Sequence, residues 1–189
     1  MKITGGNFRG RALKEPQDNR VRPTSDKVRQ AIFNILAHND FGFDLDGAKV
    51  IDLFAGTGAL GIEALSRGAA FVLFVDDSAE SRALQRQNVE TLGLTGVTKI
   101  WRRDARDLGP MAAGAGGPFD LAFLDAPYRK GLTAPALASL HNGGWLTPTG
   151  LAIAETGEDE GLDVPSGFRL LDRRSYGATA VHILTASSG

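Results

Sequence analysis

The chain of 189 residues contains no cysteine and only three histidines. Without cysteine it cannot form disulfides, use a thiolate nucleophile or build a cysteine-based zinc site. The three histidines are scattered along the sequence, so they offer no cluster of metal ligands. The composition therefore predicts a function that uses no metal ion.

Long hydrophobic runs are also missing from the sequence. No stretch of eighteen apolar residues occurs, and the N-terminal MKITGGNFRG lacks the apolar segment of a secretory signal. We therefore expect a cytoplasmic protein that does not associate with membranes. A chain of this length can form one domain with a sizeable core and a small appendage.

The net charge of −1 is unevenly distributed along the chain. Residues 1–38 carry eight Lys and Arg against three Asp and Glu, a balance of +5 that leaves −6 for residues 39–189. This asymmetry predicts a basic extension over residues 1–38 that positions a polyanion, attached to a main domain over residues 39–189. The alternative is a charged terminus that is only solvated.

Apolar runs typical of strands alternate with helical patterns through the main domain. Strands are predicted at 48–54, 70–76, 97–104, 119–125 and 150–155, and helices at 59–68, 78–92 and 133–141. Fully apolar strands separated by helices predict a parallel sheet that is covered on both faces, which is a doubly wound α/β fold. The low-complexity stretch 105–118 is predicted to be a flexible loop.

The last two predicted strands, 168–174 and 179–185, are separated by only four residues. That separation is too short for a helical crossover, so the two strands should pair antiparallel. A mostly parallel, seven-stranded Rossmann-like sheet that ends in an antiparallel hairpin resembles the sheet of class I methyltransferases.

The N-terminal extension should begin with a hairpin over residues 1–16 and continue with a helix capped by Thr24 or Ser25. Val28, Ala31, Ile32, Ile35 and Leu36 share one apolar face of that helix. We expect this face to dock on the main domain and Lys27, Arg29 and Asn34 to point elsewhere.

The stretch VIDLFAGTGALG places Gly56, Gly58 and Gly61 in GxGxxG spacing between a strand and a helix, which predicts a cofactor-binding loop. Asp52, four residues before the first glycine, would repel the pyrophosphate of NAD. S-adenosylmethionine has cationic groups and no phosphate, so an acid at this loop suits it. The alternative is that Asp52 only accepts hydrogen bonds from loop amides.

Two further acids follow predicted strands. Asp76 lies 20 residues after Gly56, the spacing at which an acid binds ribose hydroxyls, although Asp77 is an alternative. Asp104 follows the third strand and is predicted to accept a hydrogen bond from the adenine amino group. The predicted cofactor-binding residues are Asp52, Phe54, Gly56, Gly58, Asp76, Asp104 and Ala105.

The stretch FLDAPYRKG ends the strand that should lie beside the first strand, at the switch point of the sheet. Its end would then border the methyl donor. Asp125 can accept a hydrogen bond from an exocyclic amine, a carbonyl of the Ala126–Pro127 turn can accept the second, and Tyr128 can stack on the base. Two fixed acceptors would localise the nitrogen lone pair for in-line attack on the methyl group, without a strong base.

The tetrapeptide DAPY is similar to the [D/N]PP[Y/F] motif of amino-group methyltransferases. Together with GGNFRGRALKEP, RPTSDKVRQAIFNIL, VIDLFAGTGALGIEALSRGA and RRSYGATAVHIL, it makes nearly the whole chain resemble the bacterial small-subunit rRNA guanine-N2 methyltransferase family. The resemblance implies methyl transfer from S-adenosylmethionine to a guanine of 16S ribosomal RNA, with residues 125–128 as the catalytic motif. It also implies ribosomal RNA as partner, either alone or in an assembling small subunit, contacted by Arg9, Arg11, Arg22 and Arg29.

The chain departs from the family pattern at two positions. Ala126 stands where the family usually has Pro, which keeps the accepting carbonyl but loosens the turn. Asp76 stands where the family commonly has Glu, one methylene longer. Three other functions stay open at this point: a DNA adenine-N6 methyltransferase, a non-catalytic RNA-binding assembly factor, and an NAD-dependent oxidoreductase, which Asp52 and the C-terminal hairpin disfavour.

Overall fold

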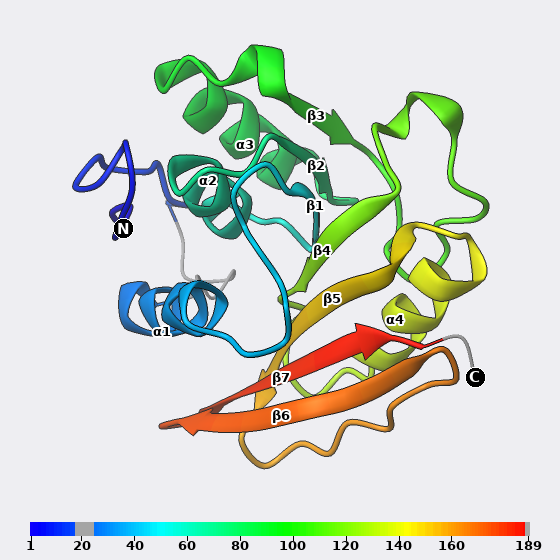
Figure 1. Ribbon diagram of the computed structural model, residues 1–189. Helices are drawn as coiled ribbons and strands as arrows, with labels where there is room; N and C mark the ends of the chain where they lie inside the picture. Colours follow the sequence, from blue (N-terminus) through cyan, green and yellow to red (C-terminus); the bar gives the residue numbers. More distant parts are fainter. Residues whose placement is uncertain (18–24, 188–189) are drawn as a thin grey trace.

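The computed structural model, in which residues 1–17 and 25–187 are described, is built around one seven-stranded sheet (Figure 1). The strand order is β3-β2-β1-β4-β5-β7-β6. The strands are β1 Lys49–Leu53, β2 Phe71–Val75, β3 Thr98–Trp101, β4 Phe119–Leu124, β5 Leu146–Gly157, β6 Phe168–Tyr176 and β7 Thr179–Ala186. The α-helices are α1 Asp26–Ala37, α2 Ala59–Ser66, α3 Ala79–Thr91 and α4 Thr133–Asn142, and short 3₁₀ helices cover Thr95–Val97 and Ala113–Ala115.

The strand directions confirm the predicted fold class. The pairs β1–β2, β2–β3, β1–β4 and β4–β5 are parallel, whereas β7 pairs antiparallel with both β5 and β6. Asp52 of β1 lies opposite Phe74 of β2 on one side and Phe123 of β4 on the other. The strand predicted at 119–125 therefore lies beside the first strand, and the segments that follow β1 and β4 emerge next to each other.

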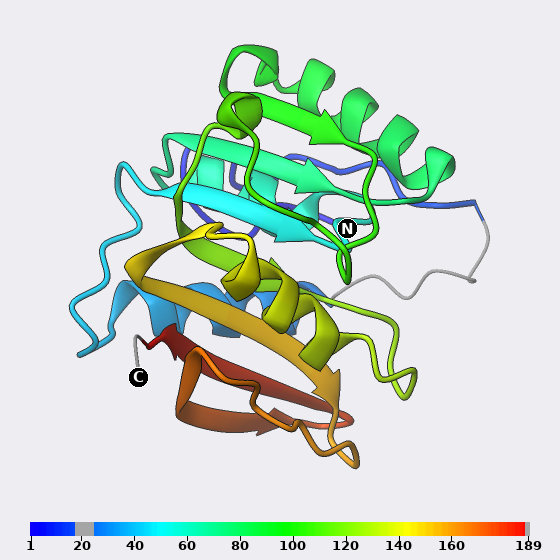
Figure 2. The ribbon, with the colours of Figure 1, turned by 90° about the vertical axis from the view of Figure 1, so that its right-hand side faces the viewer.

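The sheet separates two apolar cores, because alternate residues of each strand face opposite sides. Helices α1, α2 and α3 cover one face, and α4 covers the other (Figures 1 and 2). Phe33 of α1 packs at a tilt on Phe123 of β4, with ring centroids 5.6 Å apart. On the other face Trp145 stacks on Phe119, with centroids 6.5 Å apart. Both faces of the central strands are thus buried, as their continuous apolar sequences predicted.

Residues 105–118 are packed against the domain, so the prediction of a flexible loop there is wrong. Ala105, Leu108 and Ala115 are buried in the core on the α4 side. The indole Nε1 of Trp145 donates a hydrogen bond to the Gly109 carbonyl at 2.8 Å. Small apolar side chains and one aromatic anchor order a stretch whose composition is typical of a mobile loop.

The N-terminal hairpin forms as predicted and lies along α2. Lys2 and Ala12 form an antiparallel bridge. The carboxylate of Glu63 in α2 accepts hydrogen bonds from the backbone N–H of Thr4 and Gly5, both at 2.9 Å. The extension is therefore attached to the helix that follows the glycine loop.

Helix α1 begins as predicted, but it directs one predicted RNA-binding residue inward. Ser25 caps the helix by accepting a hydrogen bond from Val28 N at 3.1 Å. Arg29 is fully buried, and its Nε contacts Glu63 Oε1 at 3.0 Å. The prediction that Arg29 contacts RNA is wrong for this conformation, because a buried carboxylate of α2 holds its guanidinium. Arg22 and Thr24 lie outside the described residues.

No helix in the described part of the chain combines the length and the apolar character needed to cross a membrane.

Candidate active site

A cavity of about 470 Å³ opens at the carboxyl ends of β1, β2 and β4. In open α/β sheets this edge, at the switch point, is where ligands bind. The cavity brings together the glycine loop and the tetrapeptide, which are separated in the sequence. The described residues that line it are Phe54, Gly56, Asp76, Asp77, Ser78, Ser81, Asp125, Ala126, Pro127, Tyr128 and Arg129.

The glycine loop has the backbone conformation that its glycines permit. Gly56 and Gly58 have φ of 56° and 85°, in the left-handed region that glycine adopts without steric cost. Phe54 also has a positive φ, 54°, which is uncommon for a residue with a side chain and is typical of functional sites. A Cβ on Gly61 would lie 2.5 Å from Phe74 Cε1, so that glycine permits close packing of α2 on β2.

Two buried amides of α3 hold the carbonyls of this loop. Gln85 Nε2 donates to the Gly56 carbonyl at 2.9 Å, and Asn88 Nδ2 donates to the Thr57 carbonyl at 2.9 Å. Asn88 Oδ1 also accepts a hydrogen bond from Lys14 N at 2.7 Å. The sequence reasoning did not identify these positioning residues, and the available signal was a pair of amides at i and i+3 on the inner face of a helix.

Asp76 lies at the end of β2 with both carboxylate oxygens directed at backbone amides. Oδ2 accepts from Gly56 N at 2.9 Å, and Oδ1 accepts from Ser78 N at 3.0 Å. Burial raises the pKa of Asp76 from its usual value, and these two hydrogen bonds oppose the shift. Asp77 is exposed and lines the same cavity. Both acids that the spacing indicated for a ribose therefore lie at the cavity.

Asp52 is buried behind the glycine loop and is not among the residues that line the cavity. Its Oδ2 accepts a hydrogen bond from Gly61 N at 3.0 Å. Burial raises the pKa of Asp52 well above its usual range, and the charges of Asp125 and Asp76 add to this effect. The geometry agrees with the alternative in which Asp52 accepts hydrogen bonds from loop amides.

Three other predicted cofactor residues, Gly58, Asp104 and Ala105, are also not among the residues that line the cavity. Strand β3 ends at Trp101, earlier than the sequence indicated, so Asp104 lies in the following loop and pairs with Arg106 at 2.8 Å. That partner lowers the pKa of Asp104. Ala105 is buried in the core on the α4 side. Gly58 is the N-cap of α2.

All four residues of the tetrapeptide line the cavity. Ala126 is buried, Pro127 is exposed, and the Tyr128 hydroxyl is 2.9 Å from Thr179 Oγ1 at the start of β7. The phenol is therefore anchored to the strand that distinguishes this sheet from an all-parallel one. Asp125 lies close enough to Asp52 for its charge to act on that carboxyl.

Sequence reasoning also missed Arg129, which directly follows the tetrapeptide. It has a positive φ of 59°, and its guanidinium pairs with Asp159 at 2.7 Å. The two cations after the tyrosine were visible in the sequence, but the partner that holds Arg129 lies 30 residues further on.

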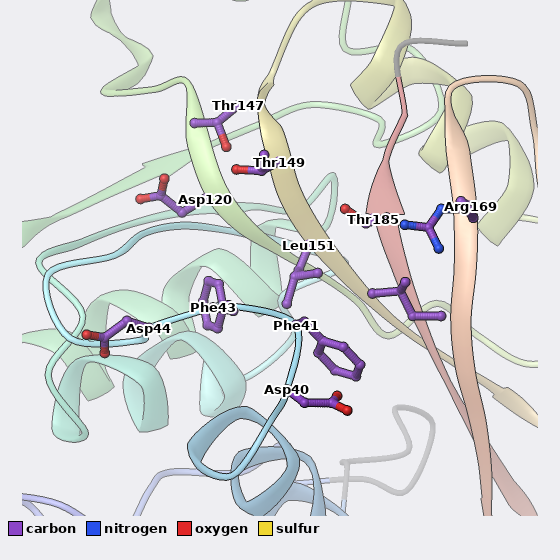
Figure 3. A pocket seen from close by; sticks show the side chains of 12 residues that line it. Asp40, Phe41, Phe43, Asp44, Asp120, Thr147, Thr149, Leu151, Arg169 and Thr185 are labelled. Carbon is purple, nitrogen blue, oxygen red and sulfur yellow. The ribbon is translucent and has the colours of Figure 1, made fainter.

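A second cavity, of about 550 Å³, lies at the opposite edge of the sheet. Figure 3 shows it between the loop that carries Phe41 and Phe43 and the strands that carry Asp120 and Arg169. Asp120 is the second residue of β4, so this edge is formed by the amino ends of the parallel strands. Of the site residues predicted from the sequence that the structure describes, none lines it. In the part of the chain that is described, no group of three or more His, Asp or Glu is arranged to hold a metal ion.

Comparison with known sequences identifies relatives along nearly the whole chain. A protein family described as conserved hypothetical protein 95 matches residues 1–185. The ribosomal RNA small subunit methyltransferase D of Escherichia coli K12 is 35% identical over 185 residues, which cover 97% of this chain and 88% of the relative.

Solved structures share the architecture. The E. coli protein yhhF superimposes with a TM-score of 0.82 at 29% identity, covering 100% of this chain and 99% of its own. An RNA methyltransferase from Salinibacter ruber, solved in complex with S-adenosyl-L-homocysteine, has a TM-score of 0.65 at 14% identity and covers 88% of this chain and 95% of its own. At that identity the second structure indicates the fold alone.

Proposed function

This chain belongs to the family described as conserved hypothetical protein 95, and we propose that it transfers a methyl group from S-adenosylmethionine to the exocyclic N2 amine of a guanine in 16S ribosomal RNA. The observation that carries the proposal is the cavity in which the glycine loop and the Asp125–Tyr128 tetrapeptide lie side by side. The relative named ribosomal RNA small subunit methyltransferase D, similar over 97% of this chain, supports ribosomal RNA as the substrate.

The lining of the cavity fits S-adenosylmethionine as cofactor. Its volume of about 470 Å³ lies within the usual range for a small-molecule site. Asp76 and Asp77 offer carboxylates to ribose hydroxyls, and Gly56 lets the backbone approach the ligand closely. Among the described residues of the lining, the one cation is Arg129, and it pairs with Asp159. A neighbour of the same fold holds S-adenosyl-L-homocysteine.

When bound, S-adenosylmethionine supplies an electrophilic methyl group next to the tetrapeptide. We assign to Asp125 the hydrogen bond from one N2 hydrogen and to the Ala126–Pro127 turn the hydrogen bond from the other. These two acceptors turn the nitrogen lone pair out of the plane of the base and toward the methyl carbon. Transfer would form the N–C bond, leave the electron pair of the broken C–S bond on sulfur, and release the surplus proton of the methylated amine to solvent.

The tyrosine of the motif has a separate role in this proposal. Tyr128 stacks on the guanine, and its hydrogen bond with Thr179 limits where its ring can lie. A guanine inside a duplex cannot reach this position, so the target nucleotide lies in a loop or is extruded from its helix.

The N-terminal hairpin is proposed to position the RNA. Arg9 and Arg11 are exposed on it, whereas Arg29 is buried and takes no part. Cations at these two positions can neutralise phosphates without reading the sequence.

The proposal is tested by calorimetry and by methyl transfer. The protein should bind S-adenosylhomocysteine, should show no heat with NAD, and should incorporate labelled methyl groups into 16S ribosomal RNA from cells that lack the gene. Digestion of the labelled RNA and chromatography of its nucleosides should yield N2-methylguanosine. Binding of NAD without a response to S-adenosylhomocysteine, or N6-methyladenosine as the product, would contradict the proposal.

A further inference from the structure

The end of β5 places a second carboxylate beside the tetrapeptide. Strands β4 and β5 are parallel, and Leu124 lies opposite Ala154. The next residue along the chain is an acid in both cases, Asp125 directly after β4 and Glu155 within β5. Neighbouring strands are about 4.8 Å apart, so the backbones of the two acids lie side by side near the carboxyl end of the sheet, where β5 continues to Gly157.

Glu155 is buried and borders a cavity next to the proposed donor site. Glu155 is only 1% exposed. It lines a cavity of about 200 Å³ together with Pro127 and Tyr128, and these two residues also line the donor cavity. The tyrosine proposed to stack on the base therefore borders both cavities.

Two adjacent carboxylates match guanine better than adenine. The Watson–Crick edge of guanine presents two neighbouring donors, the N1–H and the N2 amine, and carboxyl oxygens can accept a hydrogen bond from each. Adenine presents a lone pair at N1 beside its N6 amine, and that lone pair would face a carboxylate. Because Glu155 is buried, such a mismatch costs more than it would in solution.

We propose that Glu155 determines the base specificity of this enzyme by accepting a hydrogen bond from the guanine N1–H, while Asp125 holds the N2 amine. The inference rests on the proposed function, because it names the part of the base that the same site reads. It also distinguishes a guanine-N2 enzyme from an adenine-N6 enzyme, which the tetrapeptide alone does not do.

The test compares two bases at the target position of an RNA fragment, guanine and 2-aminopurine. Both carry an exocyclic amine at C2, but 2-aminopurine has a lone pair at N1 in place of the N1–H. Wild-type protein should methylate the guanine RNA with a kcat/KM at least tenfold higher than the 2-aminopurine RNA.

Glu155→Gln should reduce this preference. Its amide oxygen can still accept from the guanine N1–H, and its amide nitrogen can donate to N1 of 2-aminopurine. We expect kcat/KM for guanine RNA to fall roughly tenfold to a hundredfold, as for loss of a charge-assisted hydrogen bond, and the preference for guanine over 2-aminopurine to fall with it. Glu158→Gln is the matched control, because Glu158 is exposed and this substitution removes the same charge three residues further along the chain.

Each outcome is decisive. Equal losses on both RNAs in Glu155→Gln would indicate a structural role and overturn the inference. Equal use of both bases by the wild type would overturn it without any variant, so the test does not depend on the stability of Glu155→Gln. If the wild type methylates neither RNA, the proposed function fails, and the inference that rests on it fails too.

Discussion

The carboxylates around the glycine loop differ in what surrounds them. Asp76 lines the cavity and accepts from the amides of Gly56 and Ser78, whereas Asp52 is enclosed behind the loop and accepts from Gly61. Burial is the main cause of the raised pKa of both acids. An acid that is costly to ionise and does not line the cavity should affect stability more than catalysis.

Asp52→Asn should therefore stabilise the protein in a pH-dependent way. A carboxyl group whose pKa is raised on folding binds its proton more tightly in the folded state, so folding stability falls as pH rises from the unfolded value of about 3.8 through the raised folded value. The amide keeps the acceptor for Gly61 N and does not ionise. The difference in unfolding free energy between variant and wild type should be near zero below pH 3.8 and should increase above it.

Urea denaturation over a series of pH values measures this difference. Asp163→Asn, at an exposed position, is the control, and its unfolding free energy should stay close to that of the wild type across the pH series. A difference for Asp52→Asn that does not vary with pH would show that its burial carries no titration penalty.

Asp125→Ala should abolish most methyl transfer while leaving cofactor affinity nearly unchanged. The carboxylate is assigned to the amine that is methylated, and loss of one preorganised acceptor in a transition state typically costs about 10²–10³ in rate. Single-turnover kinetics with labelled S-adenosylmethionine measures the rate, and calorimetry with S-adenosylhomocysteine measures the affinity. Normal turnover would reduce Asp125 to a residue that begins a turn.

At the scale of elements, α2 connects the cofactor loop to the N-terminal hairpin. Its first residue follows Gly58 of the loop, and Glu63 is its fifth residue. The Glu63 carboxylate is fully buried and accepts hydrogen bonds from two amides of the hairpin and from two guanidinium groups, those of Arg29 and Arg67. One side chain therefore fastens the hairpin, α1 and α2 to each other.

Glu63→Ala should destabilise the fold by about 3–5 kcal/mol, because it leaves the buried guanidinium of Arg29 without its carboxylate partner in α2. Equilibrium unfolding in urea, followed by circular dichroism, measures the loss. Glu90→Ala is a suitable control, since Glu90 is exposed on α3 and should change stability by less than about 0.5 kcal/mol. Equal stabilities of Glu63→Ala and wild type would mean that the network has no net effect.

At the scale of the whole molecule, the structure shows which of the basic residues in the N-terminal extension are exposed and which are buried. Arg9 and Arg11 are exposed on the hairpin, whereas Arg29 neutralises a buried acid. The basic balance of residues 1–38 therefore overstates the charge that the described part of the extension offers to RNA. The two hairpin arginines are the cations to test.

Changing Arg9 and Arg11 together to Ala should weaken RNA binding and flatten its dependence on salt. Each lost phosphate contact should reduce the slope of log K against log salt concentration by about 0.7 for single-stranded RNA. Fluorescence anisotropy at several salt concentrations measures the slope, and affinity for S-adenosylhomocysteine should stay unchanged.

The matched control is the pair Lys49 and Arg169 changed to Ala. Lys49 is the first residue of β1 and Arg169 is the second residue of β6, so both lie at the amino ends of strands. Both side chains are exposed, and changing both to Ala removes the same charge as the hairpin pair. If this pair lowers RNA affinity as much as the hairpin pair does, binding responds only to net charge and the hairpin has no special role.

Local sequence determined the elements and the two motifs of the site. Apolar runs, glycine stops and helical periodicity act over a few residues, so they predicted the strands, the helices and the antiparallel end of the sheet. Asp76 and Asp125 reached the same cavity for a simple reason: parallel strands deliver their carboxyl ends to one edge. The extended resemblance of the sequence likewise indicated the family before the structure was considered.

Tertiary structure alone decided which charged groups are exposed and which are buried. Periodicity placed Arg29 off the apolar face of α1, yet Glu63, 34 residues away, holds it in the interior. The same applies to Asp52, enclosed by α2, and to Glu155, brought beside Asp125 by the pairing of β4 with β5. A charged side chain is buried only where a distant segment supplies compensating contacts, and a local pattern does not encode those contacts.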